Sequence, residues 1–111
     1  MKPSAVILNA MKLIATPKTW IKHDYAKSKH GTVVDSAAKD AVWFCLSGAI
    51  SCAGTSDFVA KKSANLYINQ ITYTNFNSIS ITSFNDVSTT GHKKVMRVMM
   101  AAAFHALADE K

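Results

Sequence analysis

The chain has 111 residues, of which 49% are apolar and 18% charged, and its 13 Lys and Arg residues outnumber its 7 Asp and Glu residues. This length allows one domain with a hydrophobic core. The balanced composition excludes a wholly disordered chain, and the low glycine and proline content excludes a collagen-like or linker-like sequence. We expect a single globular domain over residues 1–111 with a moderately basic surface.

The first segment carries apolar residues at helical spacing, namely Val6, Ile7, Met11 and Ile14. This pattern predicts a helix from about residue 4 to 15, ending before Pro17. The same residues faintly resemble a signal peptide, but Asn9 and Lys12 interrupt the apolar run too early. We therefore interpret the segment as a helix of the domain.

Residues 16–35 are interpreted as an ordered surface segment. Its hydrophobic side chains are expected to fix it to the domain, and they are Trp20, Ile21, Tyr25, Val33 and Val34. Lysines alternate with these anchors. The segment therefore combines cations with aromatic rings.

A second helix is expected to start at Asp35 or Ser36 and to end at Gly54. At about 100° per residue, its core-facing side chains are Val42, Cys45, Leu46, Ala49 and Ala53. Phe44 falls on the polar side and Trp43 at its border. These two aromatic rings need cover, which either residues 16–35 or a partner protein would provide.

Gly48 lies inside this expected helix, where a glycine costs about 0.5–1 kcal/mol relative to alanine. Its neighbours Ala41, Cys45 and Cys52 are also small, so they form a shallow trough. We predict that another backbone or a flat aromatic ring packs into this trough. The segment around Trp20 and the last helix are the expected sources.

A third helix is expected over about residues 57–70. From Ile71 to Phe84 the pattern alternates and is rich in Asn, Ser and Thr, which is consistent with a short hairpin around Thr74–Asn77. A turn is expected at Asn85–Asp86. A last helix follows from Thr89 or Thr90 to about Ala108. The fold class predicted is mainly α, a bundle of about four helices with a long ordered loop segment and a small β-hairpin.

The last helix is unusually apolar, because only Arg97 and His105 are polar between Val95 and Leu107. It is expected to show water a narrow polar edge and to bury the rest. Two interpretations stay open. The helix is either the central helix of a small bundle or one face of a homo-oligomer.

The two cysteines, Cys45 and Cys52, are seven residues apart. In one helix they would be about 10 Å apart, beyond the roughly 7 Å limit of a disulfide. Unpaired thiols are typical of a reducing cytoplasm. Cys45 has no histidine nearby in sequence, so we interpret it as a buried structural residue. It is not expected to be a nucleophile.

No metal site or membrane span is expected. His92 and His105 point to different sides of the last helix, and His23 and His30 lack partners at ligand spacing. No apolar run reaches the roughly 18 residues that a membrane span needs. No cofactor motif is present, because the glycines are isolated.

The sequence resembles a known family through the order of several motifs. Trp20 and Gly31 precede the run Ala41–Ala49, and Phe84–Asn85–Asp86 precedes a threonine and the final apolar helix. This order is similar to the small bacterial and phage proteins grouped as domain-of-unknown-function family 6197. Phe84 stands where a tryptophan is more usual. The resemblance implies a compact domain in a phage or mobile-element setting, and it assigns no catalytic residue.

We therefore expect a non-enzymatic phage or phage-derived accessory protein, located in the host cytoplasm. It would bind a host or phage protein, such as a defence component. Aromatic side chains are the candidate contact residues, namely Trp20, Tyr25, Trp43 and Phe44. The alternative is a nucleic-acid-associated protein whose cations contact phosphates. Those candidates are Lys18, Lys22, Lys27, Lys29, Lys93, Lys94 and Arg97.

Overall fold

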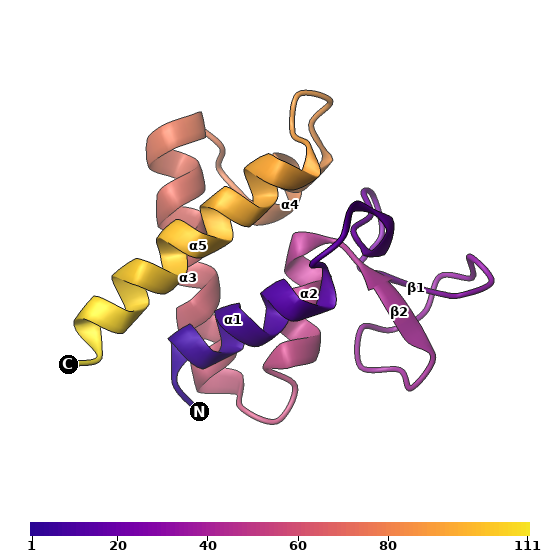
Figure 1. Cartoon of the computed structure of the whole chain (residues 1–111), viewed down its shortest axis with the longest axis horizontal. Coiled ribbons are helices and arrows are strands. Elements are labelled where there is room, and N and C mark those ends of the chain that lie inside the picture. Colours follow the sequence, from indigo (N-terminus) through magenta and orange to yellow (C-terminus); the bar gives the residue numbers. More distant parts are fainter.

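The computed structural model describes residues 1–111 and contains helices of very different lengths with one small sheet beside them (Figure 1). In chain order the elements are α1 (Pro3–Leu13), the 3₁₀ helix η1 (Pro17–Thr19), β1 (Ala26–Ser28), β2 (Ala41–Phe44), α2 (Leu46–Ala53), α3 (Phe58–Phe76), α4 (Ile81–Asp86) and α5 (His92–Asp109). The protein is mainly α, as predicted.

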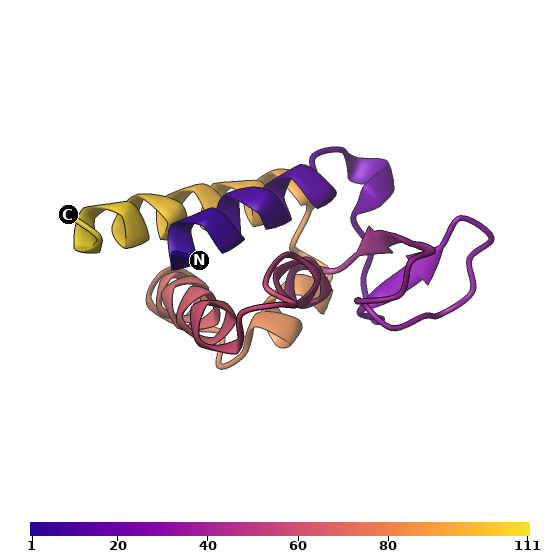
Figure 2. The same cartoon turned by 90° about the horizontal axis from the view of Figure 1, so that it is seen from below.

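The helices form two layers (Figure 2). One layer holds α1 and α5, which run antiparallel, and the other holds α2, α3 and α4. Hydrogen bonds join both ends of the first layer. Ser4 Oγ donates to Glu110 Oε1 at 2.6 Å, and His92 Nε2 lies 2.6 Å from the carbonyl oxygen of Ile14. The N-terminal helix α1 and the C-terminal helix α5 are therefore held side by side.

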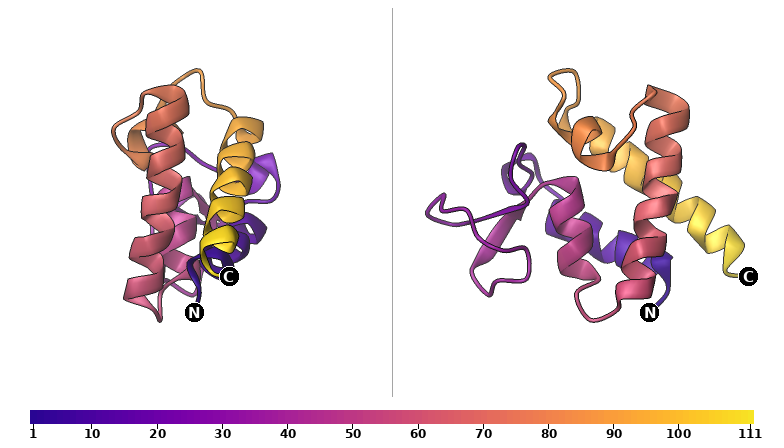
Figure 3. Two further views of the ribbon diagram at one scale, coloured as in Figure 1. Left: turned by 90° about the vertical axis from the view of Figure 1, so that its left-hand side faces the viewer. Right: turned by 180° about the vertical axis from the view of Figure 1, so that it is seen from behind.

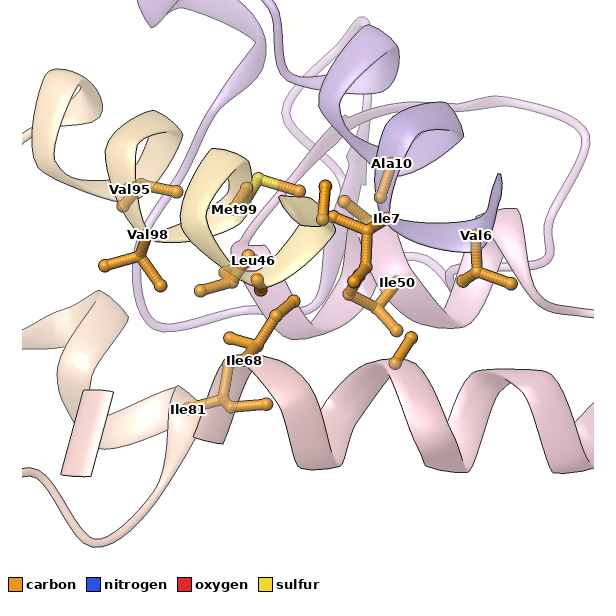
Figure 4. Packing of buried hydrophobic residues seen from close by; sticks show 14 of the residues in the cluster. Val6, Ile7, Ala10, Leu46, Ile50, Ile68, Ile81, Val95, Val98 and Met99 are labelled. Atoms are coloured by element: carbon orange, nitrogen blue, oxygen red, sulfur yellow. The ribbon is translucent and has the colours of Figure 1, made fainter. Parts of the chain in front are cut away.

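The hydrophobic core lies between the two layers (Figure 4). Each of the four longer helices contributes fully buried side chains, including Ile7 from α1, Leu46 and Ile50 from α2, Ile68 from α3, and Val95 and Met99 from α5. Small residues on α5, such as Ala102 and Ala106, let the neighbouring helices approach closely. Because α1 and α5 each bury one continuous face in this core, their apolar residues recur at helical spacing in the sequence.

The sheet projects from one end of the helices (Figures 1 and 3). β1 and β2 are antiparallel, with Ala26 opposite Phe44 and Lys27 opposite Trp43. The backbone N–H of Ile21 donates to the carbonyl of Phe44 at 3.0 Å, so the segment that leaves η1 also joins this sheet. Residues 16–35 are thus ordered through backbone pairing as well as through side chains.

The prediction of a second helix from residue 35 or 36 to 54 is wrong in its first half. Residues 41–44 form β2, and α2 occupies only Leu46–Ala53. The β-branched and aromatic residues Val42, Trp43 and Phe44 favour an extended backbone once β1 is there to pair with them. Because a strand alternates every two residues, the predicted burial of two side chains is also reversed. Phe44 is buried and Val42 is exposed.

The predicted hairpin around residues 74–77 is also wrong, because α3 continues to Phe76 and ends at Asn77 in the left-handed conformation. Ile71 and Thr72 extend the buried stripe of the helix by one more turn, since they lie three and four residues after Ile68. The expected Asn85–Asp86 turn is instead the end of the short helix α4.

The last helix is confirmed as α5, but it does not bury all of its apolar residues. Met100, Phe104 and Leu107 are exposed, with 46%, 69% and 47% of their surfaces accessible. They lie on the side of α5 opposite its core-facing alanines. The bundle has only two layers, so nothing covers this side.

The predicted close approach of another backbone to Gly48 is confirmed, although Ala41 lies in β2 and is not part of a helical trough. The backbone of Tyr25 packs against it so closely that a Cβ atom on Gly48 would lie 1.9 Å from the Tyr25 carbonyl oxygen. That carbonyl accepts a hydrogen bond from the backbone N–H of Cys45 at 3.2 Å. Gly48 is therefore the residue that lets the segment before β1 dock onto α2.

Replacing Gly48 with alanine should lower the free energy of unfolding by about 2 kcal/mol or more, because the displaced atoms are backbone and have no rotamer to adopt. Gly91→Ala is the control, since no atom lies within 4 Å of the added Cβ there. Its effect should stay below about 1 kcal/mol. Urea denaturation measures both, and equal stabilities would contradict the docking role of Gly48.

Candidate functional site

The completely buried side chain of Asn85 connects three segments. Its Oδ1 accepts hydrogen bonds from Trp20 Nε1 at 2.7 Å and from the backbone N–H of Leu46 at 3.0 Å. Its Nδ2 donates to the carbonyl of Ile21 at 3.1 Å and to Asp86 Oδ1 at 2.9 Å. A single amide therefore joins α4 to the N-terminus of α2 and to the segment that follows η1.

Next to this amide, Asp86 holds His23 in an unusual backbone conformation. His23 has a φ of +76°, a region that non-glycine residues seldom adopt. Its backbone N–H donates to Asp86 Oδ1 at 2.9 Å, and its Nδ1 lies 3.9 Å from Asp86 Oδ2. The carboxylate therefore stabilises the sharp change of direction before β1.

A small pocket of about 140 Å³ opens beside these residues. Its lining combines a thiol, an imidazole, a hydroxyl and carboxylates, from His23, Asp24, Tyr25, Cys45, Thr82 and Asp86. The fold thus brings a histidine and an aspartate to the pocket that Cys45 also lines. This proximity could not be seen in the sequence, where Cys45 has no histidine neighbour.

Cys45 is the N-cap of α2, and not a residue in the middle of a helix as predicted. Its Sγ accepts a hydrogen bond from the backbone N–H of Gly48 at 3.2 Å. Helix N-termini can favour thiolates. Here burial raises the pKa of the Cys45 thiol, and this effect exceeds the opposing effect of the backbone hydrogen bonds. The geometry is that of a neutral capping thiol.

Neither this pocket nor any other part of the chain forms a metal-binding cluster. No group of three or more His, Cys, Asp and Glu side chains lies close enough together to hold a metal ion. Cys45 and Cys52 are both free thiols. None of the helices combines the length and the apolar character that crossing a bilayer requires.

The four predicted aromatic contact residues have different environments. Tyr25 is exposed, and Trp20 and Trp43 are half-buried. Phe44 is only 2% exposed and belongs to the core, so it is unable to contact a partner on the surface. The strand β2 turns its ring inward, whereas the expected helix would have turned it outward.

Three of the predicted phosphate-binding cations are engaged within the chain. Lys22 Nζ donates to the carbonyl of Val87 at 2.7 Å, and Lys94 Nζ donates to that of Thr89 at 3.2 Å. Lys27 lies 3.8 Å from Asp24. The other four extend into solvent, and they are Lys18, Lys29, Lys93 and Arg97.

An exposed surface lies on α5, the helix for which the sequence analysis left open a role as one face of an oligomer, although it did not identify Met100, Phe104 and Leu107 as contact residues. Met100, Phe104 and Leu107 follow each other at spacings of four and three residues, so they share one face of the helix. Lys93 and Arg97 continue the same stripe toward the start of α5. We call these five residues the α5 outer face. The signal was present in the sequence, because α5 has more apolar residues than one core-facing side can hold.

The other end of the α5 outer face is also basic. A shallow hollow beside Phe104 and Leu107 is bordered by Lys2 and Lys111. The face therefore has an apolar centre with cations at both ends. Only one carboxylate, that of Glu110, also borders this hollow.

Comparison with known proteins places the chain in a family. Residues 1–105 match the family of unknown function DUF6197, so the chain belongs to this family, as the sequence motifs indicated. No curated protein and no solved structure shows significant similarity to the chain.

Removing the Asn85 amide should destabilise the fold strongly. Asn85→Ala leaves Trp20 Nε1 and the Leu46 N–H without their acceptor, and we expect a loss of about 2–4 kcal/mol. Asn75→Ala on the exposed side of α3 is the control and should change stability by less than about 0.5 kcal/mol. Urea denaturation followed by tryptophan fluorescence measures both. A loss of stability for Asn85→Ala as small as that of the control would contradict the role of Asn85 in joining the three segments.

The raised pKa of Cys45 predicts slow alkylation in the native protein. Burial also raises the pKa of Cys52, but this thiol is only half-buried, so a reagent reaches it more easily. Iodoacetamide at pH 8 should modify Cys52 first and Cys45 only after unfolding in urea. Peptide mass spectrometry measures the order, and preferential native labelling of Cys45 would contradict its structural role.

Proposed function

We propose that this member of DUF6197 acts by binding another protein through the α5 outer face. The supporting observation is the exposed stripe of Met100, Phe104 and Leu107 on a regular helix. A contiguous apolar patch rimmed by charged residues is typical of a protein interaction site. Aromatic residues and methionine, the types found here at Phe104 and Met100, are enriched in the cores of such interfaces.

The charges around this stripe favour a particular kind of partner. Lys93 and Arg97 lie at one end of the apolar centre, and Lys2 and Lys111 lie at the other. A partner with an apolar patch and carboxylates on both sides of it would match this surface in hydrophobicity and in charge.

The same charges disfavour a second copy of the chain as the partner. When two copies of this face pack together in either direction, a basic end of one meets a basic end of the other. Like charges at an interface reduce affinity. We therefore propose a different protein as the partner, and self-association through α5 becomes an outcome of the test.

The biological setting that we propose is the one that the family resemblance implies. The protein would be a non-enzymatic accessory protein of a phage or a phage-derived element. It would bind a host or phage protein in the host cytoplasm. The high pKa of the Cys45 thiol supports a non-enzymatic role, since a nucleophilic cysteine needs its thiolate form.

Nucleic-acid association is the alternative function. The exposed cations Lys18, Lys29, Lys93 and Arg97 favour it. Its support is weaker, because Lys22, Lys27 and Lys94 are held by contacts within the chain. Trp20, a candidate stacking residue, donates its indole N–H to Asn85. Retention on DNA or RNA that falls steeply with salt would favour this alternative.

Affinity capture from a bacterial lysate tests the proposal with two matched variants. Phe104 and Phe58 are both 69% exposed and both lie on helices, but only Phe104 belongs to the α5 outer face. We expect the wild type and Phe58→Asp to retain one protein in stoichiometric amount. Phe104→Asp should retain at least tenfold less, because a carboxylate in the apolar centre opposes binding. Mass spectrometry identifies what is bound.

Three outcomes would contradict this proposal. In the first, both variants retain the same protein equally, so the α5 outer face takes no part. In the second, the retained material is nucleic acid and is lost with salt. In the third, sedimentation velocity shows a dimer of the chain that Phe104→Asp abolishes. The last result would identify a second copy as the partner.

A further inference from the structure

A second surface feature lies on the side of α3 that faces away from α5. It is a groove of about 360 Å³, and its lining includes Lys62, Asn65, Leu66, Asn69 and Ile79. Tyr67, which donates to Asp109 of α5 at 2.7 Å, marks the opposite side of α3. It lies about 160° around the helix axis from Asn65 and Asn69. The groove is thus distinct from the α5 outer face.

Two of the residues that line this groove carry an amide oxygen without a hydrogen-bond partner. The Oδ1 atoms of Asn65 and Asn69 are both buried, and no donor reaches either of them. A buried carbonyl oxygen without a donor destabilises the folded protein. No group of the chain bonds to either oxygen, so neither amide is held in place by an internal hydrogen bond, and both are free to turn toward a ligand at the groove.

The spacing of the two asparagines fits an extended peptide. Residues four apart in a helix are separated by about 6 Å along its axis. Alternate residues of a β-strand repeat every 6.4–6.8 Å and present their N–H and C=O groups to the same side. An asparagine amide offers one acceptor and two donors, which complement one main-chain N–H and one C=O group.

We propose that this groove binds an extended segment of a partner protein, whose main chain pairs with the Asn65 and Asn69 amides. In the bound state each amide turns about χ2, a broad torsion, so that its oxygen accepts from a peptide N–H group. Its NH₂ group donates to a peptide carbonyl. Both unsatisfied oxygens then acquire donors.

The walls of the groove specify the side chains of this segment. Leu66 and Ile79 are strongly exposed there, with 63% and 81% of their surfaces accessible. They would cover apolar side chains at alternate positions of the peptide. Lys62, also at the groove, would pair with a carboxylate. The expected ligand is an extended segment with alternating apolar residues and at least one Asp or Glu.

The probes for the test are octapeptides selected from a random display library on the wild-type protein and then synthesised. Fluorescence anisotropy measures their affinity. Asn65→Ala and Asn69→Ala should each weaken binding at least tenfold, whereas Asn75→Ala on the same helix should change it less than twofold. Phe104→Asp should leave it unchanged, so failure of the function proposed for α5 and failure of this site are distinguishable.

N-methylated versions of the same peptides test the main-chain contacts without changing the protein. Methylation of the amides at two alternate positions should weaken binding at least tenfold, and methylation of the intervening amides should not. Thermal melts check that the Asn65 and Asn69 variants fold. We expect melting temperatures at or above that of the wild type, because each variant removes an unsatisfied oxygen.

Two results would overturn the proposal. One is that selection yields no octapeptide whose binding survives in the Phe104→Asp variant. The other is that the selected peptides bind equally well after N-methylation at either set of positions. The second result is informative even if an asparagine variant fails to fold, because it uses the wild-type protein.

Discussion

One buried side-chain amide fixes the position of the β region, by which we mean the segment from Trp20 to Phe44 that contains β1 and β2. Asn85 alone supplies the acceptor for the indole of Trp20 and for the N-terminus of α2, and it donates to the chain at Ile21. Its neighbour Asp86 fixes the turn at His23. The short helix α4 therefore presents two adjacent polar side chains to the segment before β1, and it also packs Ile81 and Phe84 into the core. The small Cys45 pocket and the exposed Tyr25 side chain both follow from this arrangement.

The two proposed binding surfaces have the same physical origin. A bundle of only two layers covers one side of each long helix and leaves the other side to solvent. On α5 the uncovered side is apolar with basic ends, and on α3 two half-buried asparagines border that side, with buried oxygens that have no donor within the chain. The apolar stripe on α5 suits a partner with a matching apolar surface. The amides on α3 suit a partner segment whose main-chain N–H and C=O groups are free to form hydrogen bonds. The two helices thus suit different kinds of partner segment.

The parts of the fold that were predictable from the sequence are those that depend on local periodicity. The apolar stripes of α1 and α5 continue over several turns, and the tertiary structure merely covers them. The small residues around Gly48 also indicated a close approach, which Tyr25 makes. Residues 41–44 were not predictable, because Val42, Trp43 and Phe44 fit a helix or a strand. Only pairing with β1, about fifteen residues earlier, decides between them. The role of Asn85 was equally hidden, since its partners lie about 40 to 65 residues away.

The long sequence separation of the Asn85 hydrogen bonds has a consequence for the order of folding. Trp20 and Asn85 are 65 residues apart, so their contact closes a large loop, and loop closure has an entropic cost before any contact forms. The helices can gain stability earlier, through their local hydrogen bonds and through the packing of α3 against its chain neighbours α2 and α4. The β region acquires its anchor only when α4 is already in place. It is therefore expected to order late and, by the same energetics, to be the first part of the native protein to open.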